Sequence, residues 1–180
     1  AIPLQVQTPL QKYKYTAVDN AKLKIEDKTS FPIIPTIHGY VKSGETIQVI
    51  ALVTDLPAGH KNYEELCDEI KELCTRTGIQ CQNEVQKIIV SEDQRVATHI
   101  ATIQKLMDYI DNKDELYLCM TYGTKPLSQA MLMAMQHAKT RKNASIECIV
   151  YGEIKRPTGD ESEWKGNIYD MTALAYLDDM

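Results

Sequence analysis

The chain reads Leu116-Tyr-Leu-Cys-Met-Thr-Tyr-Gly-Thr-Lys-Pro-Leu-Ser-Gln-Ala-Met131 at the point that decides its fold. The apolar run over residues 116–120 is typical of a buried strand. It stops at a turn that contains Gly123, and Pro126 then opens an amphipathic segment, as proline commonly does in the first turn of a helix. The stretch therefore predicts a strand, a short turn and a helix.

A turn of this kind is suited to holding an anion. Gly123 lets the backbone approach closely, Thr124 supplies a hydroxyl, Lys125 supplies charge, and unpaired N–H groups point outward from the helix start. It is not a P-loop, because the four-residue spacer between glycines and the Gly-Lys-Ser/Thr ending are absent. From local spacing alone, a plain strand-to-helix turn with a solvated lysine is an equal alternative.

Apolar and amphipathic segments alternate along the rest of the chain. Strands are predicted over residues 47–54, 85–90, 116–120 and 146–151, and helices over residues 62–73, 96–110 and 127–138. The Asn62 and Glu65 pair resembles a capping box, and Ser91 with Gln94 gives a second capping signal. The alternation predicts right-handed crossovers and therefore an α/β, Rossmann-like three-layer sandwich with a mostly parallel sheet.

Weaker signals lie at both ends of this pattern. Residues 12–16 suit an edge strand, which residues 22–25 continue or pair with, and a helix is predicted from Phe31 to near Gly44. A closing strand and short helix are predicted from Ile168 onward. Residues 1–11 carry two prolines and are interpreted as an extended lead-in or linker, so the domain is predicted to span residues 12–180.

Composition excludes several classes of function. The net charge of −5 argues against a broad nucleic-acid face, so duplex nucleic acid is not an expected partner. The odd, scattered cysteines favour reduced thiols, and neither they nor the histidines have metal-site spacing. Neither a Gly-x-Gly-x-x-Gly fingerprint nor a Gly-x-Ser-x-Gly elbow occurs, so no cofactor is expected and hydrolase chemistry is poorly supported. No apolar run reaches membrane-spanning length and no signal peptide is visible, so we expect a cytoplasmic domain.

Ligands of doubly wound sheets bind outside the carboxyl ends of the strands, and two predicted polar loops fall there. The candidate ligand-binding residues are Thr54, Asp55, Leu56, Pro57 and His60 in the first loop, and Thr121, Tyr122, Gly123, Thr124, Lys125 and Ser128 in the second. The helix that follows the second loop carries Met131, Met133 and Met135 around its circumference. This spread indicates burial on more than one side and favours a homodimer contact there.

Several of these segments together resemble the CRISPR-associated Rossmann-fold (CARF) sensor domains. They are residues 47–55, the helix after Asn62, the helix after Ser91-Glu92, residues 116–135, and Ile146-Glu-Cys-Ile-Val-Tyr-Gly152. The resemblance covers roughly residues 12–180 and is sharpest at Thr121-x-Gly-Thr-Lys125. Many relatives have two glycines before the Thr-Lys pair. Here the first of these positions is Tyr122, which we expect to narrow the pocket or to stack on a base.

The resemblance implies a homodimer that binds cyclic oligoadenylates, the second messengers of type III CRISPR antiviral defence. The ring lies across the two-fold axis between both Gly-Thr-Lys turns. Cyclic tetra-adenylate suits two identical half-sites best, with cyclic hexa-adenylate as the alternative. Such sensors control an effector, commonly a nuclease or a membrane segment. No Arg-x-x-x-x-His ribonuclease signature occurs in this sequence, so we expect the effector elsewhere, for example as a membrane anchor of a longer protein.

Two other hypotheses stay open. Some relatives cleave their own ligand, and Lys125 with Thr124 or Ser128 would support such ring nuclease activity by stabilising transition-state charge. No clear general base accompanies these residues, so a binding module is the preferred interpretation over an enzyme. The remaining alternative is an unrelated phosphate- or nucleotide-binding regulator with a Rossmann-like fold.

Overall fold

The computed structural model describes residues 1–4 and 10–179. Its strands are β1 (Tyr15–Ala17), β2 (Thr46–Ile47), β3 (Ile50–Thr54), β4 (Gln80–Cys81), β5 (Gln86–Val90), β6 (Glu115–Cys119), β7 (Ser145–Lys155) and β8 (Lys165–Asp170). Its α-helices are α1 (Ile33–Tyr40), α2 (Pro57–Thr77), α3 (Val96–Asp108) and α4 (Lys125–Lys142). Short 3-10 helices are η1 (Ala21–Leu23), η2 (Glu161–Glu163) and η3 (Thr172–Asp179).

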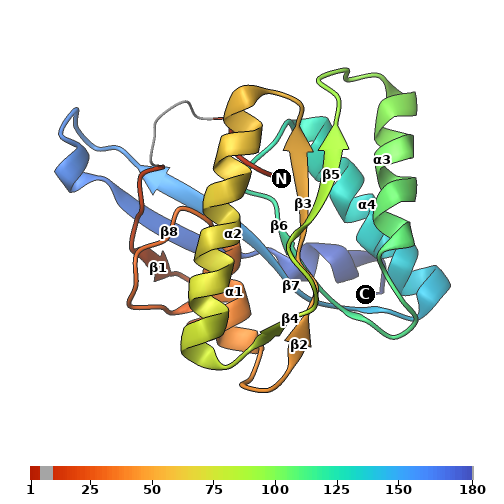
Figure 1. The fold of residues 1–180 in the computed structure, drawn as a ribbon, viewed down its shortest axis with the longest axis horizontal. Coiled ribbons are helices and arrows are strands. Elements are labelled where there is room, and N and C mark those ends of the chain that lie inside the picture. Colours follow the sequence, from red (N-terminus) through yellow and green to blue (C-terminus); the bar gives the residue numbers. More distant parts are fainter. Residues whose placement is uncertain (5–9, 180) are drawn as a thin grey trace.

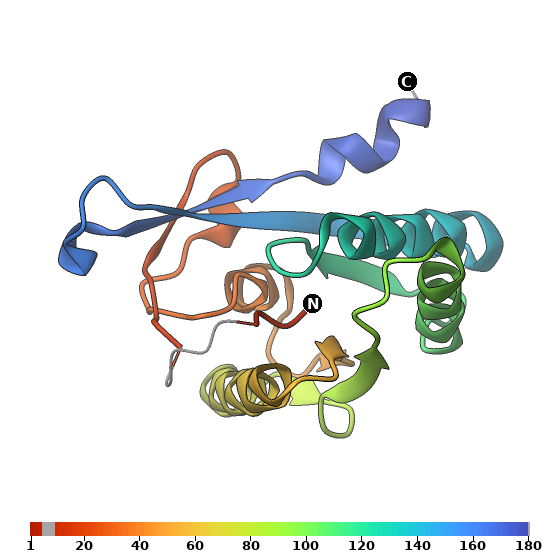
Figure 2. The same ribbon diagram turned by 90° about the horizontal axis from the view of Figure 1, so that it is seen from above.

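The strands pair mostly in parallel. One sheet has the order β1-β8-β7-β6, and two further pairs, β2–β4 and β3–β5, are parallel. Among the described pairings of named strands only β7–β8 is antiparallel. Helices α1 and α2 lie on one side of the strands, and α3 and α4 lie on the other (Figures 1 and 2). The predicted α/β, Rossmann-like layered fold with a mostly parallel sheet is confirmed.

Strand β3 is buried on both faces, as its nearly continuous apolar run predicts. Ala51 and Val53 belong to the hydrophobic cluster that includes Leu66 of α2. Leu52 points the opposite way and belongs to the cluster that includes Met131 of α4. Side chains of a strand alternate between its two faces, so β3 contributes to the hydrophobic core on both sides.

Residues 1–4 lie beside β3. The Ile2 N–H donates a hydrogen bond of 3.0 Å to the Leu52 carbonyl, and Ile2 and Leu10 are both buried in the cluster between β3 and α2. In Figure 2 these first residues lie between the β3–β5 pair and β6. The predicted lead-in covers residues 1–11, of which residues 5–9 lie outside the described residues. The described residues Ile2 and Leu10 of this segment are part of the packed domain.

Helix α2 begins at Pro57, so the predicted start at Asn62 is wrong. Pro57 occupies the first helical position, where its missing N–H costs nothing. Asn62 and Glu65, which resemble a capping box in the sequence, hold the N-terminal segment instead. The Asn62 side-chain amide donates to the Pro3 carbonyl at 2.8 Å, and the Glu65 carboxylate accepts the Leu10 N–H at 2.8 Å.

Several other boundaries differ from the predictions. Residues 21–23 form η1 rather than a strand, and α1 ends at Tyr40, ahead of the predicted glycine end. The run over residues 47–54 is interrupted, because β2 and β3 pair separately with β4 and β5. The segment 22–25 is drawn inward by Leu23 and Ile25, which are both buried, so it turns rather than pairing as a strand.

The start of α3 also departs from its predicted cap. Arg95 precedes the helix without a side-chain cap, and the Ser91 hydroxyl accepts the N–H of Asp93 instead. The Asp93 carboxylate accepts the Arg95 N–H at 3.0 Å and the Thr98 hydroxyl at 2.9 Å. A carboxylate near a helix start is favourable, so Asp93 takes the place that the pattern assigned to Ser91.

In the part of the chain that the structure describes, no helix is both long enough and apolar enough to cross a membrane.

Candidate functional site

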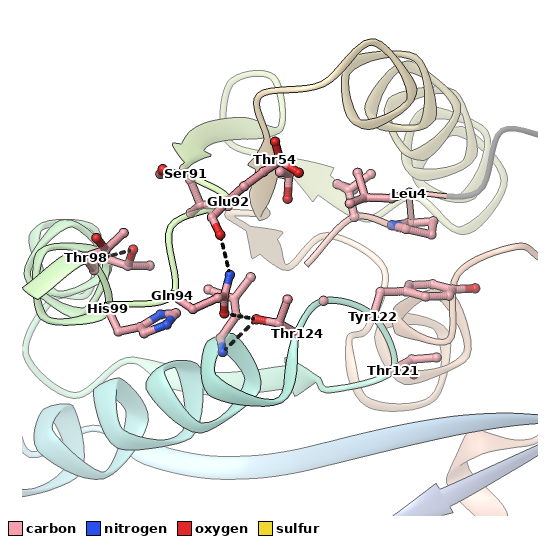
Figure 3. A pocket seen from close by; sticks show the side chains of 16 residues that line it. Leu4, Thr54, Ser91, Glu92, Gln94, Thr98, His99, Thr121, Tyr122 and Thr124 are labelled. Carbon is pink, nitrogen blue, oxygen red and sulfur yellow. Dashed lines mark hydrogen bonds between the residues drawn. The ribbon is translucent and has the colours of Figure 1, made fainter. Parts of the chain in front are cut away.

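A cavity of about 530 Å³ opens at the carboxyl ends of β3, β5 and β6. This is where doubly wound sheets bind ligands, and the volume falls within the range of small-molecule pockets. Figure 3 shows side chains converging on it from several elements. Its lining residues are Ile2, Pro3, Leu4, Thr54, Val90, Ser91, Glu92, Gln94, Thr98, His99, Thr102, Thr121, Tyr122, Gly123, Thr124 and Leu127.

The turn after β6 forms one wall of the cavity. Gly123 has a φ of +99°, and an added Cβ would lie 2.9 Å from the Ala1 Cβ, so both conformation and space favour glycine here. The Thr124 hydroxyl caps α4 by accepting the Leu127 N–H at 3.3 Å. It also donates to Gln94 Oε1 at 2.9 Å, which joins this turn to the loop after β5 (Figure 3).

Thr121 and Tyr122 are anchored by contacts behind this wall. Thr121 Oγ1 accepts the Gly152 N–H at 2.8 Å, which ties the turn to β7. The Tyr122 hydroxyl donates to the Ser30 carbonyl at 2.6 Å, its ring packs edge-on against Phe31, and burial raises the pKa of the phenol. In Figure 3 the ring points away from Gln94. Tyr122 therefore borders the cavity near its backbone, and its ring packs in the core instead of entering the cavity.

The cavity contains little positive charge. Among the described lining residues Glu92 is the one with a formal charge, and neither lysine nor arginine is present. Lys125 is exposed at the first position of α4 and does not line the cavity. Pro126 has no N–H and Thr124 already caps Leu127, so the Lys125 N–H is the first-turn donor without a partner among the described residues. The anion cradle that these residues form is thus smaller than the sequence indicates.

The loop after β3 is only partly at the cavity. Thr54 lines it, whereas Asp55 borders an adjoining cavity of about 420 Å³ that Lys105 also lines. His60 Nε2 lies 2.9 Å from Asp55 Oδ1 in the first turn of α2. Of the predicted site residues, those that line neither cavity are Leu56, Pro57, His60, Lys125 and Ser128.

Sequence reasoning missed the contribution of the third strand. Ser91, Glu92 and Gln94 follow β5, and Thr98 and Thr102 follow one helical turn apart on α3. The rule that selected the loops after β3 and β6 applies equally to the loop after β5. The capping pattern of Ser91 and Gln94 accounts for this segment locally, whereas its position after a strand at the same sheet edge is the signal for a binding loop.

His99 stands out among the missed residues. Its ring extends from α3 toward the start of α4 (Figure 3). Nε2 is shielded from solvent and has no hydrogen-bond partner among the described residues. An unsatisfied buried polar atom is rare enough to require an explanation.

The cysteines do not form part of this site. All five are free thiols, and burial raises the pKa of Cys67, Cys74 and Cys81 and raises that of Cys148 to about 11. The prediction of reduced thiols is consistent with these environments, which keep the sulfur protonated.

Comparison with known proteins adds no family assignment. No protein-family model matches the chain, and a sequence search of curated proteins found no match.

Proposed function

We propose that this chain is the sensor domain of a type III CRISPR antiviral effector and binds a cyclic oligoadenylate at a homodimer interface. Ligand binding shifts the geometry of the dimer and so switches an effector. One observation carries the proposal. The Thr121–Lys125 turn, where the resemblance to CARF domains is sharpest, begins a wall of the cavity at the carboxyl edge of the strands.

The charge distribution favours a site built from two subunits. A cyclic oligoadenylate carries a negative charge on each phosphate, while the described lining of the cavity carries only Glu92. In a two-fold symmetric dimer, two copies of the exposed Lys125 and two α4 N-termini would supply the positive potential that the lining of one cavity lacks. We therefore assign the phosphates to Lys125 at the rim and other parts of the ligand to the cavity.

Exposed apolar side chains near the cavity support a homodimer contact. Val96 and Ile100 on α3 are 73% and 49% exposed, and Ile89 on β5 and Met133 on α4 are also exposed. Helices α3 and α4 pack against each other, and α3, α4 and the loop after β5 all contribute to the cavity. Burial of these side chains against a second copy would remove apolar surface from water beside the ligand.

Binding and ring opening should be measured together. The purified protein is incubated with labelled cyclic tri-, tetra- and hexa-adenylate, and both bound ligand and linear product are followed over hours. We expect tight binding of the tetra-adenylate without ring opening. Ring opening would favour the ring nuclease alternative, and failure of all three rings to bind would contradict both.

The rim lysine is tested with a matched charge control. Lys125→Ala should weaken cyclic tetra-adenylate binding strongly, because both copies of the site lose a cation. Lys71→Ala removes the same charge from an exposed position on α2 that lines neither cavity and should bind normally. Equal affinities of the two variants would remove Lys125 from the site.

A further inference from the structure

The lining of the cavity suits a neutral, hydrogen-bonding group. Six of its lining residues carry hydroxyl groups, from three strand ends and from α3, namely Thr54, Ser91, Thr98, Thr102, Thr121 and Thr124. Within the described residues, the hydroxyls of Thr98, Thr102, Thr121 and Thr124 hydrogen-bond to protein groups. Apolar side chains of Ile2, Leu4, Val90 and Leu127 also line it, and Glu92 makes the described lining unfavourable for a second anion. A few polar groups on an apolar surface fix the orientation of a small organic ligand, whereas a phosphate needs cations or several free N–H groups.

The size of the cavity points the same way. At about 530 Å³ it lies in the lower half of the range for drug-sized ligands, roughly 300–1,000 Å³. One nucleoside fits such a volume, and a ring of several nucleotides must extend beyond it. The cavity therefore has the capacity for a nucleoside unit and not for a whole ring of several nucleotides.

His99 is the residue best suited to recognise that unit. Nε2 is buried without a partner among the described residues, and an unmet buried hydrogen bond destabilises the free protein. The ring borders the cavity beside Thr98 and Thr102. The torsion about the Cβ–Cγ bond of histidine has broad minima, so rotation of the ring is the motion that would present a ring nitrogen to the cavity. A polar ligand group then satisfies it.

We propose that His99 is a specificity-determining residue that hydrogen-bonds the neutral nucleoside part of the ligand, a base edge or a ribose hydroxyl, inside the cavity. This inference rests on the proposed nucleotide-binding function and says which part of the ligand the cavity binds. The phosphates then contact the rim, where Lys125 lies, and the cavity discriminates between nucleosides.

The first test observes the wild-type protein directly. The imidazole ¹⁵N and ¹H resonances of His99 are followed by nuclear magnetic resonance during titration with adenosine, ribose and inorganic phosphate. We expect adenosine to shift them and phosphate to leave them unchanged. A response to ribose as well identifies a ribose hydroxyl as the partner, and a response to adenosine alone identifies the base. Displacement of adenosine by phosphate, or no response to any of the nucleoside probes, would overturn the inference.

The second test uses variants and cyclic tetra-adenylate. His99→Ala should weaken binding about tenfold, the effect of one hydrogen bond, and His99→Gln should recover part of the loss. His137→Ala, at an exposed position on α4 outside both cavities, should bind as the wild type does. Thermal melting checks that each variant is folded. If a variant is unfolded, the titration of the wild-type protein alone decides the role of His99.

The outcomes separate this inference from the proposed function. If cyclic tetra-adenylate binds equally to the wild type and His99→Ala, the role of His99 is wrong and the sensor function stands. If no cyclic oligoadenylate binds but adenosine shifts the His99 resonances, the sensor function is wrong and the nucleoside cavity stands. If neither ligand has an effect, both are wrong.

Discussion

The side-chain amide of Asn62 donates a hydrogen bond of 2.8 Å to the carbonyl of Pro3, joining the second turn of α2 to the first residues of the chain. Asn62 is only 1% exposed. Ile2 reaches Leu52 of β3 from the same segment, so residues 1–4 are held between helix and strand. These contacts position Ile2, Pro3 and Leu4 on the cavity.

Asn62→Ala should destabilise the protein by about 1–3 kcal/mol, because it leaves the buried Pro3 carbonyl without this donor. The measurement is the free energy of unfolding in urea. Gln104→Ala, on the exposed face of α3, is the control and should change stability by less than about 0.5 kcal/mol. Equal stability of the two variants would contradict a structural role for the Asn62 amide.

Gly123→Ala should be more destabilising than Gly44→Ala. Both glycines have positive φ, +99° and +86°, so alanine is strained at either position, typically by about 1–3 kcal/mol. An alanine at residue 44 meets nothing within 4 Å, whereas one at residue 123 would crowd Ala1 and Leu127. The difference between the two unfolding free energies isolates this steric cost. A difference of zero would mean that the turn relaxes freely.

Ile100→Asp should convert the proposed homodimer into a monomer without unfolding it, because Ile100 is 49% exposed on α3. Sedimentation velocity reports the oligomeric state, and thermal melting reports the fold. Val18→Asp introduces the same charge at a 52% exposed valine after β1 and should leave the dimer intact. A wild-type protein that sediments as a monomer with and without ligand would rule out the homodimer.

Asp93 should stabilise α3 in a pH-dependent way. Hydrogen bonds from the backbone and side chain of Arg95, and from the Thr98 hydroxyl, lower the pKa of Asp93 from 3.8. Because the folded pKa lies below the unfolded one, the stabilisation is present above about pH 3.8 and is lost as pH falls through the folded value.

Asp93→Asn should therefore be less stable than the wild type at neutral pH, and the two should converge as the pH falls below 3.8. Urea unfolding across this range gives the difference in free energy. A gap that is independent of pH would mean that the carboxylate charge contributes nothing and that only the shape of the side chain matters.

Several core strands, namely β3, β5, β6 and β7, could be predicted because their signals are local. The continuous apolar run of β3 and the strand-turn-helix pattern at Gly123 both survive in the structure. The start of α2 could not be predicted from local sequence. Asn62 and Glu65 satisfy the local rule for a helix cap, but their hydrogen-bond partners, Pro3 and Leu10, are more than fifty residues away in the sequence.

The same limit applies to the candidate site. The turn residues Thr121–Thr124 were found because glycine and the helix start mark them locally. No local sequence pattern marks His99 as a site residue, because it lies in an ordinary amphipathic helix. Its position at the cavity results from the packing of α3 beside α4. Its unsatisfied nitrogen is a property of the assembled fold and of no single segment.

The cavity lies along a seam between two halves of the domain. One wall comes from the β3–β5 pair and α3, the other from β6 and α4, and among the described residues no strand ladder joins β3 to β6. The Thr124–Gln94 hydrogen bond and the packing of α3 on α4 join the two walls. A ligand that touches both walls adds another connection, so its binding free energy is converted into mechanical stiffness between the halves. Under the proposed sensor function, this stiffening would fix the relative position of α3 and α4, which carry the exposed apolar side chains of the proposed dimer contact.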